Sequence, residues 1–513
     1  MLIDIKSGHL CDEQERIRTF KSDQEFKALV SSMPKVLDNE LIHRAVVKNF
    51  QYVTLSHVWG GREPLLQDVN QATSVWELDS SSSPNAKLRE FCKVVRKDGY
   101  RWAWSDTCCI DKTNPEVLRK SLRKMYQWYE ASAATFVHLV GVDSPSALGA
   151  LTKSLWMTRV WTAQELLAPK VIRFYNSNWE PYLGDTRFNH KESPAIMQEL
   201  AAAIEIARET IISFNPDALT IREKLRLAST RNATVEEDVA YSLIGIFESD
   251  ILPDYGEGYK ALGHLLEEIV ARSGEVIVLA WTGKSSPYNS CLPETLRVYS
   301  QTLYTSPAIE GAEMDKRVAN LRTSIPEAQA VGIHTQVIRL STARFANRRL
   351  HLPCIIFVIK QLSVQDFAHG DNYHYRARVS GIGDVEFQTS DRLSLSHPWR
   401  LILVHPWIRD LRDPLDGSPW GSLGSSTEYQ SDPEASSPRA SLLCAPPVTT
   451  TDAYTRALRL IVRLQQPFSA LLLQQQPNGE YKRVAAEHEI IVPGIERSIN
   501  LARDTRVDVV EIL

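Results

Sequence analysis

The chain has 513 residues, of which 43% are hydrophobic and 23% are charged, and its formal net charge is −4. This composition is typical of a globular protein and provides a sizeable core for about two to four domains. Because the net charge is small and negative, no overall field attracts the chain to nucleic acid or to an anionic membrane. We therefore expect no nucleic-acid partner.

Cysteine usage and the absence of targeting patterns favour the cytoplasm. The seven cysteines are scattered and include no CxxC pair, which favours a reducing compartment over a disulfide framework. The first residues carry no apolar core behind a basic head, so we predict no signal peptide. No apolar run approaches the ~20 residues that cross a bilayer. We expect a soluble, cytoplasmic protein without a membrane span.

Residues 1–43 form a lead-in, and from residue 44 to 190 short apolar runs alternate with helical patterns. Gly99 is predicted to cap the end of one helix, and Asn114 with Pro115 to begin the next. Strands that alternate with amphipathic helices predict an α/β fold, a mostly parallel sheet with helices on both faces. The predicted strands are residues 52–56, 102–105, 135–142 and 171–175, and the predicted helices are residues 86–98, from 115 onward, and 161–167.

Residues 191–285 are predicted to be a helical extension of this first domain. Thr234 and Glu237 have the spacing of a capping box before an apolar stripe. A later helix is predicted from about residue 258 to Gly274, where the glycine ends it.

Residues 290–513 are predicted to form a separate β-rich domain. Residues 380–384 have turn chemistry between two of its strands. Residues 411–451 are rich in Pro, Ser, Gly and Asp, which predicts a disordered or long exposed loop. The predicted strands are residues 355–359, 375–379, 400–404, 459–462, 470–473 and 490–492.

Three blocks of the first domain resemble the fungal heterokaryon incompatibility (HET) domain. They are YVTLSHVWG at residues 52–60, followed by Glu63, WSDTCCIDK at residues 104–112, and WMTRVWTAQEL at residues 156–166. The blocks occur in the order expected for the family. Residues 231–281, with Arg231 and EDVAYSLIGIF at residues 237–247, extend the resemblance toward the basidiomycete-type branch.

HET domains resemble TIR domains, which implies a flavodoxin/TIR-like sheet for residues 44–190. Some TIR domains cleave NAD+ with a glutamate on a helix, within a Trp-Cys-x-x-Glu-Leu segment. Residues 161–166 are similar to that segment in spacing. The resemblance implies Glu165 as a catalytic residue and NAD+ as a substrate, with no bound cofactor.

Glu165 has two interpretations. A carboxylate in a cleft could stabilise the oxocarbenium character of a ribosyl centre as nicotinamide leaves. It could instead be the ion-pair partner of Arg159. Arg159 itself is a candidate for binding a phosphate or carboxylate, or for a structural ion pair with Glu165 or Asp106.

Asp106, Ser56 and His57 each follow or end a predicted strand. In an open parallel sheet, ligands bind beyond the carboxyl ends of the strands, so Asp106 is a candidate catalytic residue and Ser56 and His57 are candidates for substrate binding. The alternatives are a loop-closing acid for Asp106 and a hydrogen-bonded strand-end histidine for His57. We expect Glu165, Asp106 and Arg159 to line one polar cleft at this edge, with Ser56 or His57 nearby.

Cys108 and Cys109 are more simply explained as buried small side chains than as metal ligands or nucleophiles. No Cys or His pair has zinc spacing, so we predict no metal site.

The family resemblance implies a non-self-response effector that promotes programmed cell death. Its HET domain would act through TIR-like NAD+ cleavage or as a non-enzymatic module that works by self-association. In either case we expect a protein partner or self-association, with a nicotinamide nucleotide as the candidate small ligand. The β-rich domain is expected to regulate the first domain or to bind a partner.

Overall fold

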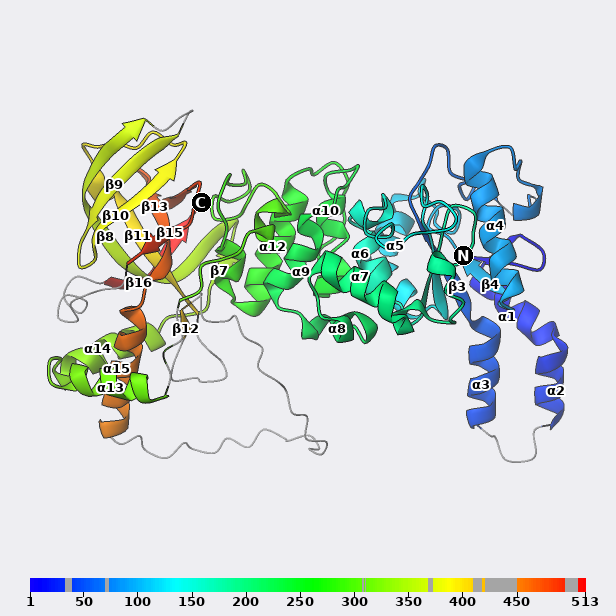
Figure 1. The fold of residues 1–513 in the computed structure, drawn as a ribbon, viewed down its shortest axis with the longest axis horizontal. Coiled ribbons are helices and arrows are strands. Elements are labelled where there is room, and N and C mark those ends of the chain that lie inside the picture. The colour runs from blue at the N-terminus through cyan, green and yellow to red at the C-terminus, as the bar shows by residue number, and fades with distance from the viewer. Residues whose placement is uncertain are drawn as a thin grey trace. The chain divides into compact units, whose positions relative to one another are not determined.

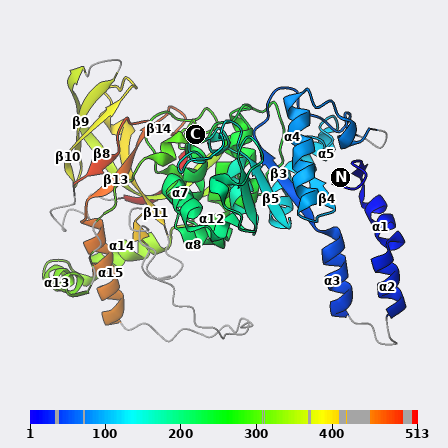
Figure 2. The same ribbon diagram turned by 45° about the vertical axis from the view of Figure 1, so that its right-hand side comes forward.

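A computed structural model of the chain describes residues 1–32, 39–69, 73–306, 309, 311–367, 372–408, 418–419, 450–493 and 506–513. These residues divide into two compact units, Met1–Ala261 and Leu262–Leu513 (Figures 1 and 2). Each unit has a sheet of its own. None of the helices within the described residues combines the length and the apolar character needed to cross a membrane.

Unit 1 is built on a mixed, mostly parallel sheet of six strands. Four strands, β3 to β6, are parallel, whereas β1 runs antiparallel to β4 and β2 runs antiparallel to β1. In spatial order the strands are β2 (Leu10–Cys11), β1 (Leu2–Asp4), β4 (Trp102–Trp104), β3 (Tyr52–His57), β5 (Ala134–His138) and β6 (Ile172–Tyr175). Because β3 lies between β4 and β5, the strand order reverses at β3, as it does in flavodoxin-like sheets.

Three helices connect the parallel strands: α4 (Ser83–Lys97), α5 (Pro115–Glu130) and α6 (Thr162–Leu167). Their ends follow the sequence. Gly99 takes φ 83° just after α4, and Asn114 Oδ1 accepts the N–H groups of Glu116 and Val117 at 3.0 and 3.3 Å before α5. Since the crossovers from β3 to β4 and from β4 to β5 run in opposite directions, right-handed connections put α4 and α5 on opposite faces. The predicted α/β fold is confirmed.

The first fifty residues add the two strands β1 and β2 at one side of the sheet and three helices, α1 (Glu13–Ser22), α2 (Gln24–Ser32) and α3 (Asn39–Phe50). Asp12 caps α1 in a capping box with Glu15. Figures 1 and 2 show α2 and α3 side by side, away from the sheet.

The predicted strand over residues 135–142 is shorter in the structure, where β5 ends at His138. The N–H of Leu139 still donates to the carbonyl of Tyr175 at 2.8 Å, but the chain then turns at Gly141, which has φ 80°.

Residues 191–273 are helical, as predicted. The helices are α7 (Pro194–Ile204), α8 (Arg208–Ile212), α9 (Ile221–Ser229), α10 (Asp238–Tyr241), α11 (Ile244–Phe247) and α12 (Lys260–Ser273), the last of which begins at the end of unit 1.

The predicted capping box at Thr234 and Glu237 is wrong. Thr234 Oγ1 accepts the guanidinium of Arg159 at 2.7 Å, and the Glu237 carboxylate accepts the N–H groups of Gly256 and Gly258 at 2.8 and 2.9 Å. Both side chains therefore bond to residues that are distant in the sequence, and α10 has no side-chain cap.

Unit 2 is a mostly antiparallel β structure whose described residues also include most of α12 and three further α-helices, which confirms a separate β-rich C-terminal fold. Strand β8 pairs with β7, β9, β11 and β16, and the pairings β8–β11–β13–β14–β16–β8 form a closed circuit. The strands are β7 (Arg344–Ala346), β8 (Arg349–Phe367), β9 (Tyr373–Val379), β10 (Gly383–Thr389), β11 (Leu401–Ile408), β12 (Ser418–Pro419), β13 (Phe468–Gln475), β14 (Tyr481–Val484), β15 (Ile490–Val492) and β16 (Arg506–Ile512), and the helices are α13 (Gly311–Arg322), α14 (Glu327–Ile338) and α15 (Thr450–Leu464).

The predicted strand at residues 459–462 is wrong, because these residues lie in α15. The buried residues Ala457, Leu458, Ile461 and Leu464 have the spacing of one helix face and join the core of unit 2. The prediction used only residues 459–462, and a run of four residues does not distinguish a buried helix from a strand. The loop predicted at 411–451 lies almost wholly outside the described residues.

Candidate functional site

The carboxyl ends of three parallel strands bring most of the predicted residues to one edge of the sheet. Ser56 and His57 end β3, Asp106 lies two residues beyond β4, and His138 ends β5. In open parallel sheets, ligands bind at this edge where the strand order reverses. The reversal here is at β3, the strand that carries Ser56 and His57.

Glu165 on α6 reaches the end of β3. The Ser56 hydroxyl donates to Glu165 Oε2 and itself accepts Trp156 Nε1 at 2.7 Å. The Tyr129 hydroxyl donates to the carbonyl of Leu55 at 3.3 Å and lies close enough to Glu165 to affect its pKa. Ser56, Trp156 and Tyr129 are buried, whereas Glu165 is partly exposed. Two predicted site residues from separate sequence blocks, Ser56 and Glu165, are thus in direct contact.

The surroundings of Glu165 favour its protonated form. Burial among protein atoms raises the pKa of Glu165 to about 8, and the negative charge of Asp106 contributes to the rise. The hydrogen bond from Ser56, the nearby Tyr129 hydroxyl and the charge of Arg231 act in the opposite direction. At neutral pH the carboxyl is therefore mostly neutral.

Arg231 is the buried cation near Glu165. Its guanidinium donates to the carbonyls of Leu227 and Arg159 at 3.0 Å each and to Thr162 Oγ1 at 2.7 Å. Burial lowers the pKa of Arg231 to about 10, and the charge of Glu165 opposes this change. The contacts to Arg159 and Thr162 hold the start of α6, so Arg231 fixes the helix that carries Glu165.

Arg159 does not form the ion pair that was considered for it. Within the described residues, its guanidinium donates to Thr234 Oγ1 at 2.7 Å, and no ion pair joins it to Glu165 or Asp106. Its positive charge acts on Asp238 instead, where it lowers a pKa that burial raises. Its backbone pairs with Asn232 in an isolated bridge. Arg159 thus connects the third sequence block to the helical extension.

Asp106 contacts two residues of the HET-like blocks. Its Oδ2 atom accepts Trp59 Nε1 at 3.0 Å and lies 3.9 Å from Lys112 Nζ. The Lys112 ammonium lies 3.6 Å from the centre of the Trp59 ring, which is a cation–π contact. Burial lowers the pKa of Lys112, and the charge of Asp106 opposes this effect.

His57 belongs to the other face of the sheet, because successive strand residues point to opposite faces. It is the register partner of His138, and its Nε2 atom lies 3.7 Å from Glu63 Oε2. Glu63 Oε1 accepts Lys87 Nζ at 2.5 Å. Burial alone would raise the pKa of Glu63, but hydrogen bonds and charges from His57 and Lys87 lower it to about 2. The sheet therefore separates His57 from the Ser56–Glu165 pair.

Three further polar residues of the second HET-like block, Cys108, Cys109 and Asp111, contact only the protein itself in the part of the chain that the structure describes. Cys108 and Cys109 are buried, as predicted. Asp111 accepts the N–H and the hydroxyl of Thr113 at 3.0 and 2.6 Å, which closes a turn.

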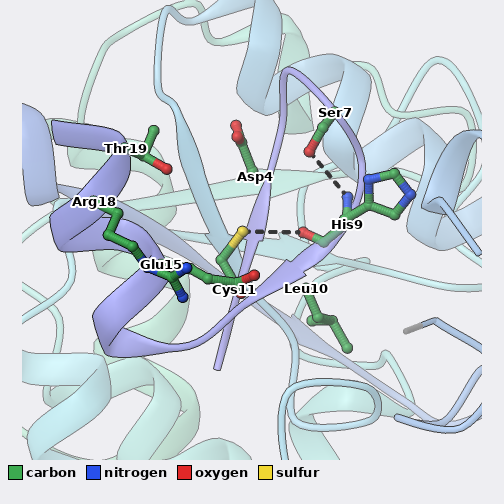
Figure 3. Close-up of a pocket in the computed structure, with 8 residues that line it drawn as sticks. All are labelled: Asp4, Ser7, His9, Leu10, Cys11, Glu15, Arg18 and Thr19. Carbon is green, nitrogen blue, oxygen red and sulfur yellow. Dashed lines mark hydrogen bonds between the residues drawn. The ribbon is translucent and has the colours of Figure 1, made fainter. Parts of the chain in front are cut away.

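A pocket of about 520 Å³ lies at the N-terminal edge of unit 1 (Figure 3). Its one thiol, Cys11, donates weakly to the carbonyl of His9 at 3.9 Å, and burial raises its pKa to about 11. A thiol in this form is a poor nucleophile. The lining residues, none of them predicted for the site, are Asp4, Ser7, His9, Leu10, Cys11, Glu15, Arg18 and Thr19.

Three residues around Glu165 were not predicted as site residues: Tyr129, Trp156 and Arg231. In the sequence, Tyr129 belongs to the apolar face of a helix, and Arg231 lies far from Glu165 along the chain. Trp156 and Arg231 lie in the HET-like segments, which was the signal that could have identified these two residues.

Comparison with known proteins supports the family resemblance. Residues 52–153 match the family model described as Heterokaryon incompatibility protein (HET), a range that includes Ser56, His57 and Asp106 and ends before Arg159 and Glu165. The chain is 33% identical over 229 residues to the Vegetative incompatibility protein HET-E-1 of Podospora anserina. The aligned region covers 42% of this chain but 16% of that relative. No solved structure gives a significant match. Residues 52–153 are therefore similar to the HET family, and a 229-residue region of the chain is similar to a short part of the vegetative incompatibility protein HET-E-1.

Proposed function

We propose that this chain is an effector of fungal incompatibility or non-self response that promotes programmed cell death in the cytoplasm. The match to the HET family and the printed name of its Podospora relative support this role. In this proposal, unit 1 carries the toxic output, and unit 2 regulates it or binds a protein partner.

The chemistry that the site supports best is cleavage of the N-glycosidic bond of NAD+, and Glu165 is the observation that carries it. A carboxyl with its pKa raised to about 8, hydrogen-bonded to Ser56 at the reversal point of the sheet, is typical of a functional site. The similarity of residues 161–166 to the glutamate segment of NAD+-cleaving TIR domains agrees with this assignment.

In the proposed reaction, the positive pyridinium ring of NAD+ enters beside Glu165 and favours its ionised form. The carboxylate then stabilises the positive charge that develops on the ribose as the C1′–N bond breaks and its electron pair leaves with nicotinamide. A water oxygen bonds to C1′ and its proton is released, so that NAD+ and water yield ADP-ribose, nicotinamide and a proton. Ser56 holds the carboxylate, and Arg231 holds α6.

Expression in a fungal or yeast host tests the effector role together with this chemistry. We expect the parent chain to arrest growth and to deplete cellular NAD+, and Glu165→Gln to do neither at equal protein level. Glu116→Gln, which changes an exposed carboxylate on α5, is the matched control and should behave as the parent.

Growth arrest that persists in a folded Glu165→Gln chain, with NAD+ unchanged in the parent, would refute the enzymatic proposal. That result would leave the HET domain as a non-enzymatic module that works by self-association.

A further inference from the structure

Trp59 stands out among the tryptophans at the carboxyl edge of the sheet because half of its surface, 50%, is exposed. Trp102 and Trp156 of the same unit are fully buried. Trp59 follows β3 by two residues, so it lies beyond the strand that carries Ser56. A large aromatic ring that stays exposed gains no free energy from apolar burial until a ligand covers it.

Two contacts hold the Trp59 ring in place. Its Nε1 atom donates to Asp106 Oδ2 at 3.0 Å, and the Lys112 ammonium covers one face at 3.6 Å from the ring centre. The surface that remains exposed therefore includes the opposite face of the indole. A ring that is fixed before binding loses little conformational entropy when a second ring stacks on it.

The chemistry around the ring indicates what stacks there. Lys112 Nζ has no hydrogen-bond acceptor within the described residues, lies 3.6 Å from the centre of the ring, and has Asp106 Oδ2 at 3.9 Å to favour its charged form. A cation on one face makes the ring a poorer partner for a second cation, so a neutral planar ring is favoured over a pyridinium. In the part of the chain that the structure describes, the contacts of Asp106 use Oδ2, which leaves Oδ1 to accept an N–H or O–H group from the ligand.

We propose that Trp59 is a stacking platform for the neutral planar base of a nucleotide, an adenine-type ring with donor groups that reach Asp106. Bases of every kind have π faces that stack on aromatic side chains. This inference deepens the proposed function, because NAD+ carries an adenine, but the binding that it predicts does not depend on bond cleavage.

Binding of adenosine monophosphate and of nicotinamide mononucleotide to the full chain, measured by isothermal titration calorimetry, tests the assignment. We expect Trp59→Leu to weaken binding of adenosine monophosphate on the order of tenfold, and Trp59→Phe to weaken it less, because a smaller ring remains. Binding of nicotinamide mononucleotide should change less than twofold. Trp399→Leu, at a tryptophan that is 60% exposed in unit 2, is the control and should bind both probes as the parent does.

Adenosine monophosphate that fails to bind the parent, or binds Trp59→Leu as tightly as the parent, would overturn the assignment. Selective loss of nicotinamide mononucleotide binding would also overturn it. Trp59→Phe keeps the test valid if Trp59→Leu does not fold. A chain that binds adenosine monophosphate through Trp59 and releases no nicotinamide from NAD+ would support the platform and refute the proposed cleavage.

Discussion

Glu165 is the residue on which the proposed chemistry depends, and its raised pKa sets the expected pH dependence. The ionised form is needed to stabilise a positive ribosyl centre, and this form prevails only above the pKa of about 8. Because kcat/KM reports groups of the free enzyme, we expect kcat/KM for NAD+ to rise about tenfold per pH unit up to pH 8 and then to level off. Initial rates of nicotinamide release between pH 6 and 9.5 measure this. A flat or falling profile would contradict the role of Glu165.

Ionisation of Glu165, which the proposed activity requires, lowers the free energy of unfolding. Its folded pKa of about 8 exceeds the ordinary value of 4.5, so its stabilising contribution is complete at low pH and is lost as pH rises toward 8. Glu165→Gln keeps the size and cannot ionise. We expect its free energy of unfolding to exceed that of the parent by a margin that grows by about 2 kcal/mol between pH 5 and pH 8. Because Glu165 is partly exposed, this margin is smaller than the free energy that corresponds to the whole difference between the two pKa values.

Urea unfolding at several pH values measures this margin. A margin that shrinks as pH rises would show that Glu165 is ionised in the folded protein at neutral pH.

The contacts of a residue could be predicted only where its partners lie nearby in the sequence. Ser56 was predicted from its place at the end of an apolar strand and Glu165 from the resemblance of residues 161–166 to a TIR-domain segment, and the fold brings them together. The pairing of Arg159 could not be predicted, because its partner Thr234 lies on a segment 75 residues away. Arg231 gave no local sign of its contact with Thr162 for the same reason.

Among the helices, α11 packs against α5 through a glycine. A Cβ atom at Gly245 would lie 2.1 Å from Cβ of Tyr126, a distance that requires the two helices to separate. We expect Gly245→Ala to lower the free energy of unfolding by about 2–4 kcal/mol. Gly60→Ala, where the added carbon meets no atom within 4 Å, should change it by less than about 0.5 kcal/mol. Equal stability of the two variants in chemical denaturation would contradict this packing.

The elements themselves were predictable where pattern and local chemistry agreed. Strands β3 and β4 and helices α4, α5 and α12 follow from apolar spacing and from caps at Gly99, Asn114 and Gly274. Errors arose where tertiary contacts took over a local signal, as at Glu237, which binds Gly256 and Gly258. Strands β1 and β2, of three and two residues, were not predicted, whereas β4, also three residues long, was predicted from its place in the alternation of strands and helices.

The chain as a whole has two compact units, and the boundaries predicted at residues 43, 190 and 285 stay predictions. The Pro-, Ser- and Gly-rich composition of residues 411–451 predicts preferred proteolysis there. We expect trypsin or a broader protease at low ratio to cut the native chain first within this range, as read by mass spectrometry of the fragments. First cleavage within residues 44–190 would contradict the proposed organisation.

The most direct test of the central claim is the release of nicotinamide from NAD+ by the purified full chain, followed by liquid chromatography over many turnovers. We expect the parent to produce equal amounts of nicotinamide and ADP-ribose, and Glu165→Gln to lose at least about 100-fold in rate while it unfolds at the same or a higher temperature. A parent chain that releases no nicotinamide, or a folded Glu165→Gln variant that turns over as fast as the parent, would contradict the claim.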